Sequence, residues 1–468
     1  MTIHLKRTSD NFVGERHRPA FHFTPPKNWM NDPNGLVHHN GEYHLFYQHN
    51  PFGREWGHMH WGHAVSRDLI SWKHLPLALC EEEDGDTLMF SGSVVVDHLD
   101  SSGLSRSGAP AMVALYTANR GALTKNKIQT LNLAWSLDCG RTFEKNPGNP
   151  LIDLGSSKFG DPKVFWHEPS KRWIMVAIEG ELQGKALFWG SANLFDWDIL
   201  GEFGDQLTAP GIWECPDLFP LSVDGGKYHR WVLITSVVHP TPTGGTELSN
   251  IAFVGDFDGT SFVRDRSVPV RRIHHGQSYA SATFNDVPDG RRLLMAWIPE
   301  SADLRGQRVW TGAQTMPREL SLKQSYEGLV VSQLPASEIQ MLRGTQTETP
   351  EGRELEISAD FEATGSAPLG LEVLKGKGKG SPVRIGWDPI RAELFIICSE
   401  GHRVAAPLAP HNGRISLSIL VDRSIIEVFA NEGIVSLTAI SYPNPDNYQT
   451  SWFGHPPLRM VGWPLHTR

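Results

Sequence analysis

Residues 66–72 have the sequence Ser66-Arg67-Asp68-Leu69-Ile70-Ser71-Trp72, and a version of this pattern returns at residues 136–143, 191–197 and 255–262. Each copy has a small residue, an acidic or amide turn and then an aromatic residue, and each follows a stretch rich in strand-forming residues. Recurrence of this kind indicates repeated supersecondary units, and all-β units of this size are typical of propeller blades. Four copies, with room for one more before Pro335, predict about five blades; chance similarity among β-turns is the alternative.

The chain is too long for one hydrophobic core, because 468 residues exceed the usual size of a single domain. Residues 338–352 are polar and rich in turn formers, as in a linker, and residues 353–468 contain strands separated by glycine-rich turns. We therefore predict an all-β fold in which a five-bladed β-propeller (1–337) and a linker (338–352) precede a C-terminal β-sandwich (353–468).

The composition limits the possible partners. The formal net charge is −9 and no long run of Lys or Arg occurs, which argues against a nucleic-acid partner. No apolar stretch is long enough to span a membrane, so we expect no membrane partner. No signal peptide is visible at the N-terminus, which predicts a cytoplasmic protein, or a secreted one if a signal segment has been removed. The sequence leaves the oligomeric state open.

Three acidic residues lie upstream of the turn motif in their predicted blades, where the innermost strand should run. They are Asp32, Asp161 and Glu214. Inner strands of a propeller line its central channel, so residues from separate blades can converge there. Because the three acids occupy equivalent places in the repeat, we expect them to share one site.

The neighbours of these acids are unusual for solvated carboxylates. Asp32 and Asp161 each precede a proline, and Glu214 is followed by Cys215 and a proline; Trp or Phe residues lie close by in all three segments. Proline cannot donate to a central ladder, so it marks a strand end or a bulge. Aromatic neighbours raise a carboxyl pKa by desolvation, and a second carboxylate raises it further. Such sites can keep one acid protonated and another ionised, as glycoside hydrolysis requires.

Several segments resemble glycoside hydrolase family 32, the invertase, inulinase and levanase group. Trp-Met-Asn-Asp-Pro-Asn-Gly at residues 29–35 is similar to the nucleophile motif of that family, and Trp-Glu-Cys-Pro-Asp at 213–217 is similar to its acid/base motif. Further similarities lie at residues 47–51, 56–63 and 90–93, and residues 422–429 resemble the sandwich domain of the family. The resemblance covers nearly the whole chain and implies the same propeller and sandwich.

The resemblance also implies roles for individual residues. Asp32 corresponds to the nucleophile, Glu214 to the general acid/base and Asp161 to the transition-state stabiliser. The residues that correspond to the walls of a fructose pocket are Asn31, Gln48, Trp56, Phe90 and Ser91, with Trp297 as a weaker candidate. No metal and no organic cofactor is implied.

The implied activity is that of a retaining, exo-acting β-fructofuranosidase. Its substrates would be fructans of the levan or inulin type, fructo-oligosaccharides or sucrose, and it would act through a fructosyl-enzyme intermediate. Three alternatives stay open: a fructosyltransferase that uses the same intermediate, a different five-bladed hydrolase such as one acting on arabinan, and a non-catalytic fructan-binding protein.

One position departs from the family pattern. Gly160 stands before Asp161, where the family usually has Arg. An Arg there would place a fixed cation close to the catalytic acids. We expect its absence to enlarge or rearrange the pocket and to push the pKa values of the neighbouring carboxyl groups upward. Another Arg could instead reach this space from elsewhere in the chain.

Overall fold

The computed structural model describes residues 13–466, except 107, 123–126, 181–183, 206, 242–243, 301–307, 326–327 and 377–379. In this part of the chain nearly all regular structure is β-strand, and the helical segments are short 3-10 turns. These turns are η1 (Val13–His17), η2 (Glu168–Ser170), η3 (Pro288–Gly290) and η5 (Ser337–Leu342). The all-β class is therefore confirmed.

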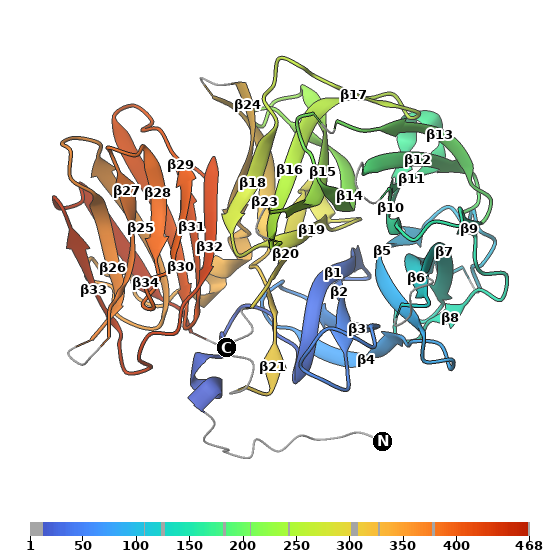
Figure 1. Cartoon of the computed structure of the whole chain (residues 1–468), viewed down its shortest axis with the longest axis horizontal. Coiled ribbons are helices and arrows are strands. Elements are labelled where there is room, and N and C mark those ends of the chain that lie inside the picture. Colours follow the sequence, from blue (N-terminus) through green and yellow to red (C-terminus); the bar gives the residue numbers. More distant parts are fainter. Residues whose placement is uncertain are drawn as a thin grey trace.

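Five antiparallel sheets, one after another along the chain, form the blades of a propeller (Figure 1). Blade 1 contains β1 (Asn28–His39), β2 (Glu42–Asn50), β3 (His60–Ser66) and β4 (Lys73–Leu79), with the later strand β21 (Trp310–Thr311) paired in parallel to β1. Blade 2 contains β5 (Thr87–Asp97), β6 (Ala111–Arg120), β7 (Ile128–Ser136), β8 (Glu144–Lys145) and β9 (Ile152–Asp153). Blade 3 contains β10 (Phe159–His167), β11 (Arg172–Glu179), β12 (Lys185–Ser191) and β13 (Asp198–Phe203).

Blades 4 and 5 complete the ring. Blade 4 contains β14 (Ile212–Ser222), β15 (His229–Pro240), β16 (Thr246–Phe257), β17 (Phe262–Arg264) and β18 (Arg271–Gly276). Blade 5 contains β19 (Tyr279–Thr283), β20 (Leu293–Ile298), β22 (Ala313–Gln314), β23 (Arg318–Ser325) and β24 (Gly328–Pro335). The innermost strands contact one another in the order β1, β5, β10, β14, β19 and back to β1, so the ring is closed around its centre.

The repeated turn motif connects the third and fourth strands in blades 1 to 4. In blade 1 the Ser66 hydroxyl donates to Oδ1 of Asp68 at 2.9 Å, and this oxygen also accepts the backbone N–H groups of Ile70 and Ser71. The next residue, Leu69, has a left-handed φ of 62°. The serine-to-Asp/Asn bond and the left-handed residue recur in blades 2 and 3, and blade 4 has the same turn around Asp258. The motif is thus a real structural repeat, in which a short polar side chain caps each turn.

A β-bulge interrupts every innermost strand at a corresponding place, and β1 has a second register shift between residues 34 and 37. The register of each strand against its neighbour skips two residues at the corresponding place, between residues 30 and 33, 89 and 92, 160 and 163, 214 and 217, and 279 and 282. Such bulges re-aim side chains and tolerate proline, because the skipped residues make no ladder bond. Three of them hold a non-glycine residue at left-handed φ: Asp161 at 56°, Cys215 at 46° and Ala280 at 51°. The five bulges turn the side chains around them toward the centre of the ring.

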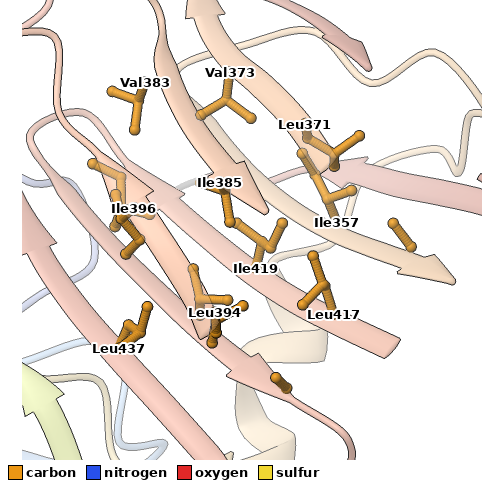
Figure 2. Packing of buried hydrophobic residues seen from close by; sticks show 14 of the residues in the cluster. Ile357, Leu371, Val373, Val383, Ile385, Leu394, Ile396, Leu417, Ile419 and Leu437 are labelled. Carbon is orange, nitrogen blue, oxygen red and sulfur yellow. The ribbon is translucent and has the colours of Figure 1, made fainter. Parts of the chain in front are cut away.

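The C-terminal part is a sandwich of two sheets (Figures 1 and 2). One sheet contains β25 (Glu354–Glu362), β30 (Arg414–Asp422), β31 (Ile425–Ala430), β32 (Val435–Ile440) and β34 (Arg459–Pro464). The other contains β26 (Leu369–Lys375), β27 (Val383–Asp388), β28 (Glu393–Ile397), β29 (Arg403–Pro407) and β33 (Gln449–Phe453). Alternate residues of both sheets point inward, and Figure 2 shows Ile357, Leu371, Ile385, Leu394 and Ile419 meeting in the core.

The sandwich is joined to the propeller by hydrogen bonds and buried ion pairs. β18 of blade 4 pairs in parallel with β32, so one sheet runs continuously from the propeller into the sandwich. The buried Arg318 of β23 donates to Glu427 of β31 at 2.5 Å. The last strand of blade 5 ends at Pro335 and β25 begins at Glu354; the domain limits at 337 and 353 stay a prediction. None of the helices in the described part of the chain has the length and apolar character that a bilayer crossing needs.

Candidate active site

A pocket of about 200 Å³ lies where the five bulges converge. Every site residue predicted from the sequence lines it: Asn31, Asp32, Gln48, Trp56, Phe90, Ser91, Gly160, Asp161, Glu214 and Trp297. Four further residues complete the lining: Gln129, Lys158, Ile178 and Tyr279. The fold therefore brings together residues that are spread over more than 260 positions of the sequence.

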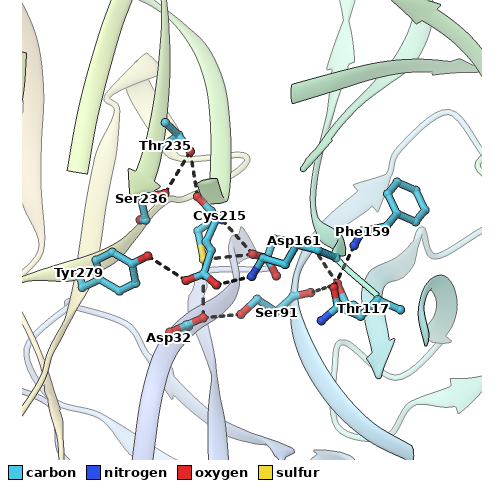
Figure 3. A network of polar contacts seen from close by, with 12 residues as sticks. Asp32, Ser91, Thr117, Phe159, Asp161, Cys215, Thr235, Ser236 and Tyr279 are labelled. Carbon is cyan, nitrogen blue, oxygen red and sulfur yellow. Dashed lines mark hydrogen bonds and ion pairs between the residues drawn. The ribbon is translucent and has the colours of Figure 1, made fainter. Parts of the chain in front are cut away.

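Asp32 lies in the bulge of β1, at the end of a chain of hydrogen bonds. The Ser91 hydroxyl donates to its Oδ2 at 2.6 Å (Figure 3), and the Asn31 amide donates to its Oδ1 at 3.2 Å. Burial raises the pKa of Asp32 to about 6; the bond from Ser91 opposes this rise, and the nearby carboxylates of Asp161 and Glu214 add to it. Asp32 is therefore ionised near neutral pH, with its orientation fixed by two donors.

The donors to Asp32 are held in turn by Gln48. The Gln48 amide donates to Ser91 at 2.6 Å, and its carbonyl oxygen accepts from Asn31 at 3.2 Å. The indole of Trp29 donates to the side-chain oxygen of Asn31 at 2.8 Å, which fixes the amide of Asn31 with its N–H groups toward Asp32. Every member of this network has a defined partner, and such networks hold side chains in one arrangement.

Asp161 lies in the bulge of β10 and connects three blades. Its backbone N–H donates to the Thr117 hydroxyl at 2.8 Å, and its Oδ2 accepts the backbone N–H of Cys215 at 2.9 Å (Figure 3). The Thr117 hydroxyl donates to the carbonyl oxygen of Ser91 at 3.0 Å. Burial raises the pKa of Asp161, although the Lys158 ammonium acts to lower it.

Glu214 immediately precedes the bulge of β14, and each of its carboxylate oxygens has one donor. The Tyr279 hydroxyl donates to Oε2 at 2.8 Å, and the Lys158 ammonium pairs with Oε1. Glu214 and Lys158 are both partly exposed, with 26% and 23% of their side-chain surfaces open. An incoming ligand can therefore reach this carboxyl group directly from the pocket.

Cys215 lies between the acids without the character of a nucleophile. Its Sγ is 3.6 Å from Oδ2 of Asp32 and 3.7 Å from Oδ2 of Asp161. Burial and the surrounding carboxylates raise the pKa of this thiol well above its usual value, so it stays protonated. The thiol packs between two carboxylates and can act only as a weak donor to them.

Aromatic side chains form the mouth of the pocket. Trp56 is 47% exposed and meets Phe90 edge-on, with ring centroids 6.0 Å apart. Trp29 and Trp297 meet deeper in the molecule at 5.7 Å, and Trp297 reaches the lining. Apolar rings beside a few polar groups are typical of a small-molecule site.

One expectation from the sequence needs correction, and one possibility that it left open concerns the cation of the pocket. The three acids do not occupy equivalent places in the repeat: Asp32 is the second skipped residue of its bulge, Asp161 is the first, and Glu214 comes just before its bulge. The positions differ because each innermost strand presents a different residue of its bulge to the centre of the ring. Among the described residues that line the pocket there is no Arg, and the cation there is Lys158, which lies in none of the motifs found in the sequence. The only signal for it was its place two residues before Gly160.

The expected effect of Gly160 on the pocket and on the neighbouring pKa values stays a prediction. The pKa values of Asp32 and Asp161 are raised, but burial is the largest cause in both cases. The space beside Gly160 is not empty, because a Cβ added there would lie 2.6 Å from the Thr117 hydroxyl oxygen. Within the described residues there is no cluster of three or more His, Cys, Asp or Glu side chains that could hold a metal ion.

Comparison with known proteins gives consistent matches over most of the chain. The family model for the N-terminal domain of the glycosyl hydrolases of family 32 matches residues 22–333, and the model for the C terminal of that family matches residues 327–455. The chain is 40% identical to a levanase from Bacillus subtilis (strain 168) over an alignment of 483 positions. This alignment covers 95% of this chain and 69% of that protein.

Solved structures give the same result. The exo-inulinase from Aspergillus awamori matches with a TM-score of 0.86 and 29% identity, over 96% of this chain and 98% of the other. The fructofuranosidase from Schwanniomyces occidentalis, solved with fructose, matches with a TM-score of 0.85 and 30% identity, over 98% of this chain and 100% of the other.

Proposed function

The chain belongs to the glycosyl hydrolases of family 32, and from this membership and its pocket we propose that it is a retaining, exo-acting β-fructofuranosidase. It releases terminal fructose from fructans, fructo-oligosaccharides or sucrose. The observation that carries this proposal is the convergence of Asp32, Asp161 and Glu214 in a single pocket.

In the first step Asp32 acts as the nucleophile. Its carboxylate attacks the anomeric carbon of the terminal fructosyl unit while Glu214 gives a proton to the leaving oxygen. Two donors, Ser91 and Asn31, orient the attacking carboxylate and help keep it ionised. The products of this step are the shortened sugar chain and a fructosyl group esterified to Asp32.

In the second step a water molecule displaces Asp32 from the anomeric carbon. Glu214, now ionised, accepts a proton from a water molecule, whose oxygen attacks the anomeric carbon and releases Asp32. Two displacements at one carbon retain its configuration. Asp161 accepts hydrogen bonds from fructose hydroxyl groups and favours the positive charge that develops on the ring in each transition state. Its backbone N–H bond to Thr117 and its acceptor bond from Cys215 support this position.

The size of the pocket favours action at a chain end. Its volume of about 200 Å³ is below the roughly 300–1,000 Å³ of pockets that hold drug-sized ligands, so it suits a single sugar unit. The rest of a fructan chain would leave through the mouth beside the exposed Trp56. Relatives named levanase and exo-inulinase support both the substrate class and the exo mode.

The alternatives receive less support. A transferase would use the same residues, but the similar proteins from Bacillus subtilis and Aspergillus awamori are named levanase and exo-inulinase, which are hydrolases. A binding protein without catalysis would not need three carboxyl groups held in place by separate donors. Fructose-containing ligands in relatives support a sugar in the pocket, as with the fructofuranosidase solved with fructose.

Incubation with levan, inulin and sucrose, followed by chromatographic analysis of the sugars over time, tests the proposal. Fructose should appear from the first time point without intermediate oligosaccharides, and NMR should show it as the β-anomer at first. Free glucose in excess of fructose from sucrose would instead indicate transfer, and no release from any of the three sugars would contradict hydrolysis.

A further inference from the structure

The pocket has three acids and a single cation among the described residues that line it. Asp32, Asp161 and Glu214 supply the acids, and Lys158 supplies the cation. Carboxylates that share a site raise one another's pKa values unless a positive charge lies nearby. The balance of charge in this pocket therefore depends on one lysine side chain.

Lys158 is well placed for this task. Its backbone is fixed on both sides, because its N–H donates to the Ser156 hydroxyl at 3.2 Å and its carbonyl oxygen accepts the N–H of Gly180 at 3.0 Å. From there its side chain enters the pocket and pairs with Glu214. Glu214 and Asp161 raise the pKa of Lys158 against the lowering effect of burial, so the ammonium form persists in the pocket.

Gly160, two positions further on, contributes no side chain to the pocket. Gly160 lines the same pocket and has no side chain. A Cβ atom added at this position would lie 2.6 Å from the hydroxyl oxygen of Thr117. A large cationic side chain at position 160 would compete with Lys158 for the same acids. The cation in this pocket therefore comes from position 158, while position 160 carries no side chain.

The Lys158 ammonium has more N–H donors than its bond to Glu214 uses. A lysine ammonium carries three N–H groups, and the bond to Glu214 is the one that Lys158 makes within the described residues. The 23% of its side chain that stays exposed faces the pocket that it lines. Sugar hydroxyl groups are suitable acceptors for the remaining donors, and bonds from a charged donor are stronger than neutral ones.

We propose that Lys158 is the cation of the active site: its ammonium contacts Glu214, offsets the negative charge of the acids that share the pocket, and donates to a hydroxyl group of the bound fructosyl unit. This inference rests on the proposed function, since it takes the pocket to bind fructose.

The charged and titratable groups around Lys158 come from four strands. They are Asp32 on β1, Asp161 on β10, Glu214 and Cys215 on β14, and Tyr279 on β19. Of these, Asp161 is the group whose pKa Lys158 acts to lower. Removing the ammonium raises the pKa of Asp161 further, so a higher pH is needed before Asp161 ionises.

The experiment compares Lys158→Met, Lys158→Arg and the unchanged protein. Lys158→Met keeps most of the side-chain length and removes the charge, whereas Lys158→Arg keeps the charge. Lys185→Met is the matched control, because Lys185 forms an exposed ion pair with Glu202 on the outer strands of the same blade. For each protein we would measure kcat/KM as a function of pH, fructose binding by calorimetry, and Tm.

Lys158→Met should lower kcat/KM roughly 10- to 100-fold, as expected for a lost bond to a charged group. The fall of kcat/KM on the acidic side of its pH profile should begin at a higher pH in this variant. Its Kd for fructose should rise about tenfold. Lys158→Arg should recover most of each property, and Lys185→Met should match the unchanged protein. A merely structural role would lower Tm without moving the pH limb, and recovery by Arg would then be absent.

An active protein whose Lys158→Met variant keeps the original pH limb and fructose affinity would overturn the inference and leave the proposed function standing. If the unchanged protein releases no fructose from any substrate, the proposed function fails, and fructose binding alone decides the role of Lys158. Weaker fructose binding by Lys158→Met would then support it, and equal binding, or none by either protein, would overturn it.

Discussion

The Ser91 hydroxyl donates to Oδ2 of Asp32 across 2.6 Å, and the two residues occupy corresponding positions in the bulges of β5 and β1. Two neighbouring blades thus supply the nucleophilic carboxylate and its strongest donor from the same point of the repeat. The bond matters chemically because it opposes the effect of burial, which raises the pKa of Asp32 to about 6.

Ser91→Ala should move the acidic limb of kcat/KM to higher pH. In the unchanged protein activity should fall below about pH 6, where Asp32 becomes protonated. Without the Ser91 hydroxyl the ionised form of Asp32 loses a donor, so its pKa rises further. A pH series of initial rates checks this. Ser93→Ala is the control, since Ser93 lies on the same strand but accepts the backbone N–H of Val164 outside the pocket; an equal shift in both variants would contradict the role of Ser91.

Asp32→Asn should abolish turnover and stabilise the fold at neutral pH. Loss of the nucleophile should lower kcat by at least roughly 10⁴-fold. The pKa of Asp32 is higher in the folded chain, about 6 against the ordinary 3.8, so the ionised carboxylate destabilises the fold. This cost is absent below pH 3.8 and complete above about pH 6. Tm should therefore rise by roughly a few degrees at pH 7 and little at pH 4; a lower Tm at pH 7 would contradict the assignment.

Glu214→Gln should lower the rate of turnover by an amount that depends on the leaving group of the substrate. A general acid contributes roughly 10²- to 10⁴-fold when the leaving oxygen needs a proton. With sucrose or a fructan the variant should lose activity in this range, whereas a β-fructoside with an acidic phenol as leaving group needs little protonation and should form the intermediate readily. A burst of phenol followed by slow turnover would show this. Equal losses on both kinds of substrate would speak against an acid role for Glu214.

Gly160→Ala should damage the site through Thr117. The added Cβ would lie 2.6 Å from the Thr117 hydroxyl oxygen, which accepts the backbone N–H of Asp161. We expect a loss of about 1–3 kcal/mol in the free energy of unfolding, together with a lower kcat. Thr117→Ala should remove the clash, so the double variant should lose less than the sum of the two single variants. Additive losses in denaturant unfolding would show that the two positions do not meet.

His22 should make stability depend on pH above neutrality. Burial alone would lower its pKa, but the hydrogen bond with the Asp422 carboxylate and the nearby charge of Glu427 raise it to about 9. Because the folded pKa exceeds the ordinary 6.5, this stabilisation is complete below pH 6.5 and is lost as the pH rises through about 9. Tm of the unchanged protein should fall between pH 6.5 and 9, and His22→Gln should have a lower Tm at pH 6 and a flatter curve. The same slope in both proteins would exclude His22 as its source.

The contacts of Asp422 are an example of tertiary structure that the local sequence does not predict. Its carboxylate accepts the backbone N–H groups of Ala20, Phe21 and His22, about 400 positions earlier in the chain. In the sequence Asp422 is only the first residue of a segment that resembles the sandwich domain. Nothing near it predicts that it fastens the N-terminal segment to β30.

The sequence by itself determined the all-β class, the blade repeat, the sandwich and the three acids. These features follow from local rules: a short polar side chain caps a tight turn, alternation defines a strand, and proline beside an acid marks a break in a ladder. Local rules act between neighbours along the chain, so they can be found by inspection. The motif at residues 66–72 is an example, since its serine, aspartate and left-handed residue all lie within four positions.

Only the tertiary structure decided how the acids are staggered, which cation serves them and what fills the space beside Gly160. The bulges present a different residue of each strand to the centre, and Lys158 and Thr117 reach the site from positions with no motif of their own. These relationships arise when five blades close into a ring and bring distant residues within a few ångströms. The distances between such residues depend on the whole ring, and no stretch of sequence contains that information.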